Sequence, residues 1–143
     1  MSDWQCYSST NMKDWVYEGE ILSNSEISWA NDNYSSLAGQ VIKYGNKYYF
    51  YCCTSTKGEY GGGKSIGVAV SVSPTGKFVD IGKTLVRNID TYNGVHTWED
   101  IDPTFWIETD EKGVEHRILG WRNTRFFNCE LTENMISIKK RWR

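Results

Sequence analysis

Carboxylates and tryptophans are the side chains whose type and placement in this sequence could do chemistry. Asp102 precedes Pro103, and a carboxylate can take part in acid–base chemistry when its surroundings set its pKa. An Asp-Pro pair can equally do no more than cap a strand or begin a turn. Trp29, Trp98 and Trp121 could stack on the apolar face of a sugar, although core packing explains each indole equally well. The sequence therefore offers one candidate carboxylate site with aromatic side chains as candidate substrate-binding residues.

Metal and disulfide chemistry find little support in the sequence. His96 and His116 have no carboxylate or cysteine partner at ligand spacing, so we predict no metal and no cofactor. The four cysteines include no C-x-x-C pair, and the neighbours Cys52 and Cys53 would point to opposite faces of a strand. They are best interpreted as small buried hydrophobic residues. This pattern fits a reducing compartment slightly better than an oxidising one, which slightly favours the cytoplasm.

Composition restricts the class of protein. The 143 residues are enough for one domain with a real core, and the 15% of aromatic residues excludes a disordered tail. A formal net charge of −2 does not indicate binding to nucleic acid or to an anionic membrane, which a basic surface would attract. No stretch approaches the ~20 apolar residues of a membrane span, and the first residues do not read as a signal peptide.

The secondary-structure signals are those of β-strands. The pair Gly45-Asn46 separates two apolar runs, 40–44 and 47–53, which predicts a tight β-hairpin. The second run has apolar residues on both faces, so we expect an interior strand that is packed on each side. The run 66–72 has bulky residues on one face and only Gly, Ala and Ser on the other, which suits a close approach of two sheets.

A further hairpin and an internal repeat complete the pattern. We predict strands at 105–107 and 117–119 around a turn at 110–113, followed by a strand at 126–131. The segment 15–22 matches 78–85 as aromatic-Val-x-x-Gly-x-x-Leu, at an offset of 63 residues. Four strands in each repeat of this length indicate the blade of a β-propeller and argue against a β-sandwich.

The repeat length also predicts how much of a propeller the chain contains. Division of 143 residues by 63 gives about 2.3 units, whereas closed propellers have typically four to eight blades. We therefore expect an all-β, partial β-propeller of about two and a half four-stranded blades. The units are the second half of one blade (1–22), a full blade (29–86) and most of a further blade (101–138). Such a chain should self-associate, or its missing blades should come from other chain segments.

Three segments resemble glycoside hydrolase family 43, which has a five-bladed propeller. The segment 7–15 is similar to the family's S-x-D-M-x-x-W stretch, and 38–51 with 66–78 resembles its second blade. The segment Ile101-Asp102-Pro103-Thr104-Phe105 resembles its I-D-P-x-x-F blade opening, and 131–137 resembles the end of that unit. The resemblance covers nearly the whole chain.

The family resemblance implies a function and a role for one residue. It implies an inverting hydrolase of xylose- or arabinose-containing poly- or oligosaccharides, with no cofactor and a xylan- or arabinan-type carbohydrate as partner. Asp102 corresponds to the family's modulator of the pKa of the general acid. The family's general base, an Asp, would precede this chain and its general acid, a Glu, would follow it, so we expect the chain alone to be inactive.

Two other functions stay open. The absence of both catalytic groups favours a non-catalytic, propeller-derived carbohydrate-binding or assembly module. A related propeller clan that acts on fructans is a third reading, in which Trp29-Ala30-Asn31-Asp32 would imitate a W-x-N-D-P nucleophile segment. Asn33 replaces the proline of that motif and Ile101 an arginine before the second aspartate. If association of chains rebuilt an active site, Asp32 and Glu99 would be the first carboxylates to test.

Overall fold

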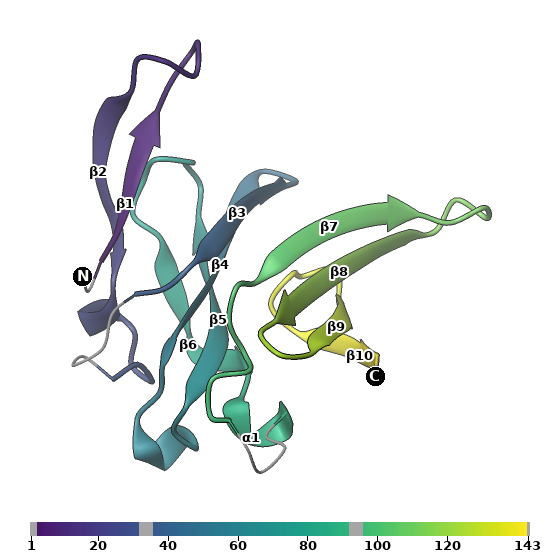
Figure 1. Cartoon of the computed structure of the whole chain (residues 1–143). Helices are drawn as coiled ribbons and strands as arrows, with labels where there is room; N and C mark the ends of the chain where they lie inside the picture. The colour runs from purple at the N-terminus through teal and green to yellow at the C-terminus, as the bar shows by residue number, and fades with distance from the viewer. Residues whose placement is uncertain (1–2, 32–35, 92–95, 143) are drawn as a thin grey trace.

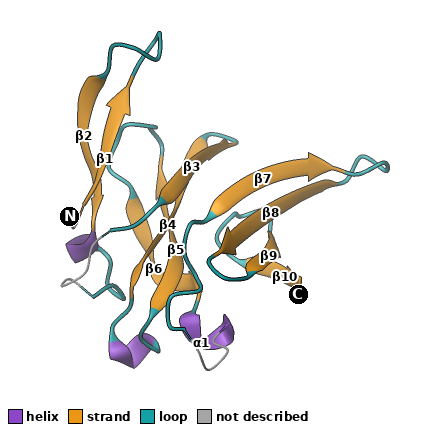
Figure 2. Ribbon diagram, in the orientation of Figure 1, coloured by secondary structure: helices purple, strands orange, loops and turns teal. Residues whose placement is uncertain are grey.

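The computed structural model describes residues 3–31, 36–91 and 96–142, with side chains described as far as Lys139. Over these residues it is an all-β structure in which helices are limited to three short turns (Figures 1 and 2). The strands are β1 (Asp3–Ser8), β2 (Val16–Ser23), β3 (Gly39–Tyr44), β4 (Lys47–Ser55), β5 (Lys64–Ser71), β6 (Val79–Val86), β7 (Thr104–Thr109), β8 (Glu115–Arg122), β9 (Phe126–Leu131) and β10 (Ile138–Trp142). The helices are the 3-10 turns η1 (Asn24–Glu26) and η2 (Gly58–Tyr60) and the α-helical turn α1 (Asn88–Thr91). None of the helices in these ranges is long and apolar enough to cross a membrane.

The strands form three antiparallel sheets, each a meander of consecutive strands. Sheet 1 contains β1 and β2, sheet 2 runs β3-β4-β5-β6 and sheet 3 runs β7-β8-β9-β10. The sheets follow one another around the molecule, with sheet 2 between the other two (Figure 1). The first strands of sheets 2 and 3, β3 and β7, lie beside each other. This is the arrangement of successive blades, so the predicted all-β, partial β-propeller is confirmed.

The predicted hairpins are present at the expected residues. Tyr44 pairs with Lys47 across the two-residue turn, where Gly45 has a φ of 60° that favours glycine. The second turn is held by Asp110, whose Oδ1 accepts hydrogen bonds from the backbone N–H groups of Lys112 and Val114. The strand β10 was not predicted, because its run of cations does not alternate with apolar residues. It lies at the edge of sheet 3, where charged residues protect a sheet from pairing with other chains.

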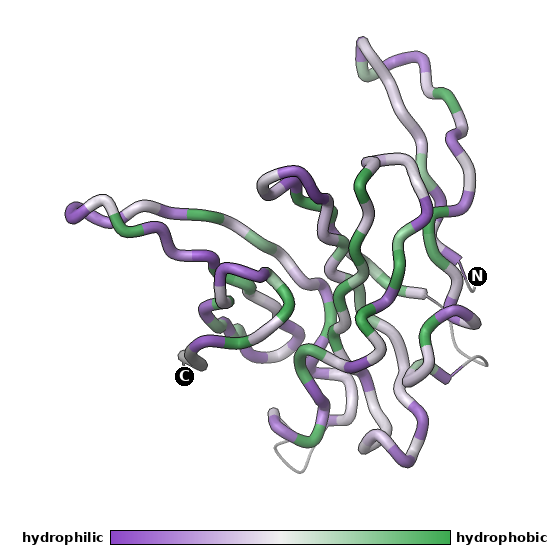
Figure 3. Tube along the Cα trace, turned by 180° about the vertical axis from the view of Figure 1, so that it is seen from behind, coloured by the Kyte–Doolittle hydropathy of each residue, from purple (hydrophilic) through white to green (hydrophobic). Residues whose placement is uncertain are grey.

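Two hydrophobic clusters hold the three sheets together, and β4 contributes to both. Tyr49, Tyr51 and Cys53 face sheet 3, whereas Phe50 and Cys52 face sheet 1. This confirms that β4 is packed on each side and that the adjacent cysteines face opposite ways. Hydrophobic residues accordingly follow the strands in the middle of the molecule, and the tips of the β3–β4 and β7–β8 hairpins are largely hydrophilic (Figure 3).

The small face of β5 explains how closely sheet 1 and its following segment approach sheet 2. A Cβ atom added to Gly67 would lie 2.3 Å from Cζ2 of Trp29. The indole therefore rests directly on the glycine backbone, and Ala69 extends the same cluster. On the opposite face of β5, Ile66 and Val68 pack toward sheet 3.

The 63-residue repeat corresponds to the last strands of sheets 1 and 2. Strand β2 covers 16–23 and β6 covers 79–86, which is the same offset. The shared glycines, Gly19 and Gly82, have φ values of 116° and 79°, and both ladders shift register near them. A β-bulge that needs a left-handed residue is thus the physical reason for the repeated glycine.

Candidate functional site

The candidate site lies where the first strands of sheets 2 and 3 begin. Asp102 is exposed and stands two residues before β7. Directly after it, the backbone N–H of Phe105 donates a 2.6 Å hydrogen bond to Oε1 of Gln40 at the start of β3. The hydroxyl of Thr104 donates to the same oxygen at 3.3 Å. Gln40 therefore joins the two sheets next to Asp102.

Asp102 has an unusual backbone conformation. Its φ is 53°, in the left-handed region, which Asp tolerates better than most residues. The following Pro103 disfavours helical conformations at the preceding residue and favours an extended one. A residue held in such a region costs about 1–3 kcal/mol and persists only where its surroundings fix it. Strain of this kind clusters at functional sites, so the backbone itself marks Asp102 as a candidate.

The surroundings of Asp102 leave its carboxylate available. Its backbone N–H points to the Cys53 sulfur, and burial raises the pKa of that thiol to about 11. Cys53 is therefore a neutral thiol, which donates to the carbonyl of Ala38 at 3.4 Å. Among the residues that the structure describes, no Lys, Arg or His forms an ion pair with Asp102. A carboxylate without a basic partner is what a pKa-raising role requires.

A cavity of about 370 Å³ lies on the same side of the molecule. Ser55 is two residues beyond Cys53 on β4, so both side chains point toward the same face of sheet 2. The ammonium of Lys64 donates a 2.7 Å hydrogen bond to the Ser55 hydroxyl, and burial lowers the Lys64 pKa. The cavity is lined by Asn31, Ser55, Thr56, Gly63, Lys64, Thr97 and Trp98. It thus combines hydroxyl, amide and ammonium groups with one indole.

The three candidate tryptophans lie in different environments. Trp98 is 44% exposed at the cavity, and its ring centroid lies 5.0 Å from that of His96. Trp29 has no exposed surface, and its indole N–H donates to Asp80 at 3.3 Å. Trp121 is 3% exposed and its indole N–H donates to Asp100 at 2.7 Å. Of the three, Trp98 alone presents an indole face that a ligand could reach in this structure.

Two buried carboxylates, Glu99 and Asp100, precede Asp102 in the chain. Asp100 is fully buried and accepts hydrogen bonds from the Thr91 hydroxyl and the Trp121 indole; burial raises its pKa to about 6. Glu99 is also fully buried, and its hydrogen bonds from Thr124 lower its pKa. Sequence reasoning missed Asp100, although three acidic residues within four positions before a strand were a usable signal. Asp32 lies outside the described residues.

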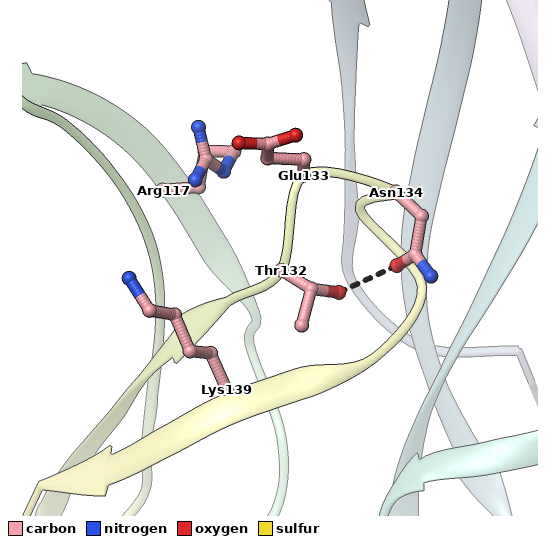
Figure 4. Close-up of a pocket in the computed structure, with 5 residues that line it drawn as sticks. All are labelled: Arg117, Thr132, Glu133, Asn134 and Lys139. Carbon is pink, nitrogen blue, oxygen red and sulfur yellow. Dashed lines mark hydrogen bonds between the residues drawn. The ribbon is translucent and has the colours of Figure 1, made fainter.

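A second cavity, of about 510 Å³, lies between β8, β10 and the loop 132–137 (Figure 4). Its lining consists of Arg117, Thr132, Glu133, Asn134 and Lys139, and the Thr132 hydroxyl donates to Asn134 at 2.6 Å. The Nε atom of Arg117 is buried without a hydrogen-bond partner. Because that atom is sealed from solvent, a ligand in the cavity cannot reach it, and we interpret this region as structural.

The sequence profile of the family described as glycosyl hydrolases family 43 matches residues 1–141. No curated protein matches the chain.

Solved structures with the same fold are glycosidases by name. The β-xylosidase RS223 matches 100% of this chain with a TM-score of 0.74 and 19% identity. An α-L-arabinofuranosidase from Clostridium thermocellum matches 96% of it with a TM-score of 0.69 and 26% identity. A β-xylosidase/α-arabinofuranosidase from a compost microbial metagenome, in complex with xylotriose, matches 98% with a TM-score of 0.71 and 18% identity. The chain spans 47%, 43% and 46% of these proteins, respectively, which is less than half of their length.

Proposed function

Because the chain belongs to glycosyl hydrolase family 43, we propose that it is part of a hydrolase that cleaves xylose- or arabinose-containing oligo- or polysaccharides with inversion. In this proposal sheet 1 is the second half of one blade, sheet 2 is a full blade and sheet 3 belongs to a further blade. The solved structures of similar fold that are xylosidases and arabinofuranosidases support this class of substrate.

Asp102 acts in this proposal as the modulator of the general acid. Inverting hydrolysis needs one protonated carboxylic acid and one carboxylate base, roughly 6.5–9.5 Å apart across the bond that is cut. A third carboxylate near the acid disfavours ionisation of the acid, so the acid keeps its proton near neutral pH and can donate it to the leaving oxygen. Asp102 suits this role because it is exposed, lies where sheets 2 and 3 meet, and has no basic partner among the residues that the structure describes. The observation that carries the proposal is this exposed carboxylate on a left-handed backbone.

Trp98 and the cavity beside it provide the contact with the sugar. An indole face covers the apolar side of a sugar ring, and the surrounding Ser, Thr, Asn and Lys side chains offer hydrogen bonds to hydroxyl groups. The buried Trp29 and Trp121 support the site from the core instead. The substrate would therefore lie across the start of β7, between Trp98 and the Asp102 carboxylate.

The chain alone should bind sugar without hydrolysing it, because the general base and acid come from other segments. Sheet 3 also has one face that no other described sheet covers, and it carries Trp106 and the 54% exposed Phe126. We propose that this face makes contact with further blades, either of the same polypeptide or of a second copy.

Sugar binding gives the direct test. Titration of the chain with xylotriose and arabinotriose, followed by nuclear magnetic resonance or calorimetry, should show weak binding. Trp98→Ala should lower the affinity about fivefold or more, because it removes the stacking surface. Trp15→Ala is the matched control, since Trp15 is 51% exposed at the distant β1–β2 hairpin tip. Equal losses in the two variants, or none in Trp98→Ala, would contradict the proposed site.

An activity assay tests the catalytic part separately. The chain should release no nitrophenol from nitrophenyl xyloside or arabinofuranoside. Release by the unmodified chain that disappears in Asp102→Asn would contradict the view that its catalytic groups are incomplete.

A further inference from the structure

We propose that Asp100 is the positioning residue for Asp102: its buried carboxylate fixes the segment that presents the Asp102 carboxylate to substrate. The proposal extends the function proposed above and rests on it for the role of Asp102. The inference concerns a residue that does not itself touch the sugar, because Asp100 has no exposed surface.

Asp100 connects two elements on either side of the Asp102 segment. Its Oδ2 accepts a 2.6 Å hydrogen bond from the hydroxyl of Thr91 at the end of α1, which leads out of sheet 2. Its Oδ1 accepts a 2.7 Å hydrogen bond from the indole of Trp121 near the end of β8 in sheet 3. The Asp100 side chain thus links the segment that connects sheets 2 and 3 to both of these sheets. Trp121 is itself fixed by stacking on Phe127, with ring centroids 5.9 Å apart.

The neighbouring residues complete the support. Glu99 accepts hydrogen bonds from the backbone N–H and hydroxyl of Thr124, in the loop that joins β8 to β9. The carbonyl of Ile101 accepts a 3.2 Å hydrogen bond from the Arg122 backbone. Asp102 follows these fixed points at once and adopts its left-handed backbone. Because such a conformation persists only where neighbours impose it, the anchors at 99–101 explain why Asp102 can hold it.

The choice of side chain at position 100 can be tested because an amide could keep both contacts. The Thr91 hydroxyl also lies 3.2 Å from the carbonyl of Asn88 and can donate to it. In Asp100→Asn the amide oxygen would accept from Trp121, while the amide N–H would donate to the Thr91 oxygen. The charge would disappear and the bridge would remain. Asp100→Ala removes both.

The experiment compares Asp100→Ala and Asp100→Asn with Glu130→Ala in the full chain. Glu130 is the matched control, since it is a 4% exposed carboxylate that accepts hydrogen bonds from His116 and Lys139 on a different part of sheet 3. The readouts are xylotriose affinity, the backbone amide resonance and the HN–Hα coupling of Asp102. Asp100→Ala should shift the Asp102 signals and weaken binding about tenfold, because two hydrogen bonds to a charged group are lost. Asp100→Asn should restore both readouts, and Glu130→Ala should change neither.

The outcomes separate this proposal from its alternatives. Unchanged Asp102 signals in Asp100→Ala, or equal changes in Glu130→Ala, would overturn it, because the effect would then be absent or a general loss of stability. If Asp100→Ala does not fold, Thr91→Val removes one arm of the bridge and should move the same signals in part; no movement would overturn the proposal. If the unmodified chain binds no xylotriose, the proposed function fails, yet the Asp102 signals still decide whether Asp100 positions that residue.

Discussion

Sheets 2 and 3 meet along β3 and β7, and the two ends of this contact differ. At the end of β3, the Tyr44 hydroxyl and Nη1 of Arg117 both donate to Glu115, at 2.7 and 2.8 Å. At the beginning of β3 lies the exposed Asp102, which has a strained backbone and no ion pair among the described residues. Both ends join the same two sheets, so joining them does not require an unpaired charge. The closed end, with Tyr44, Glu115 and Arg117, therefore serves stability, whereas the open end, with Asp102, bears an energetic cost that function explains.

The strongest response that we expect is that of the stability to pH, through Asp100 beside the open end. The pKa of Asp100 is raised from 3.8 to about 6 by burial, so its contribution to stability is fully present below pH 3.8 and is lost as the pH rises through 6. The loss amounts to about 3 kcal/mol. Urea unfolding of the chain and of Asp100→Asn between pH 4 and 7 checks this, because the difference between their free energies of unfolding should change across that range. Parallel pH profiles would show that Asp100 does not titrate there.

Loss of Arg117 at the closed end should lower the stability of the chain without changing its sugar affinity. Arg117→Ala removes a buried guanidinium with a side chain that is 7% exposed, and it leaves Glu115 and Tyr44 without their donor and neighbour. We expect the free energy of unfolding to fall by about 2 kcal/mol, since Glu115 is partly solvated and can recover water. Xylotriose affinity should not change. A loss of affinity in Arg117→Ala would mean that the two ends are coupled.

The open end should behave in the opposite way. Asp102→Gly relieves the left-handed backbone, so we expect the stability to stay the same or rise by up to about 1 kcal/mol. Sugar affinity should nevertheless decrease, because the carboxylate is gone. Thermal unfolding and xylotriose titration of the same preparation provide both values. A clear loss of stability would show that Asp102 is a structural residue like those at the closed end.

The smallest effect is expected from His116, next to the closed end. Hydrogen bonds from its ring to Glu130 and Asp110 raise its pKa above 6.5. Its contribution is therefore present below pH 6.5 and decreases as the pH rises through the higher folded value. The difference in melting temperature between the chain and His116→Asn should be larger at pH 6 than at pH 8. A difference independent of pH would assign the effect of the histidine to packing.

Several elements of the fold could be predicted from the sequence because local chemistry determines them. The Gly45-Asn46 turn, the two-sided hydrophobicity of β4 and the small face of β5 each depend on residues near in sequence. Strand β10 could not be predicted, since Ile138–Trp142 has no alternating pattern and is a strand only because β9 offers an edge. Tertiary pairing decided that case.

The site could be predicted less completely than the fold. Asp102 was found through its Asp-Pro pair and the motif around it, both of which are local. Which tryptophan is accessible depends on what covers each indole, and Trp29 is covered because Gly67 of a distant strand lets it approach. The role of Asp100 depends on Thr91 and Trp121, nine and 21 residues away. Contacts at such separations leave no pattern in a single sequence.

The meander order of the strands has a consequence for how the chain folds. Every strand pairs only with strands adjacent in sequence, so each sheet forms by closing short loops. Sheet 2 buries both faces and should open least often, whereas the β1–β2 hairpin has two strands and one covered face. In native-state hydrogen exchange the amides of β4 and β5 should therefore exchange last and those near the tip of the β1–β2 hairpin first. Local opening would then begin at the β1–β2 hairpin and reach the central sheet last.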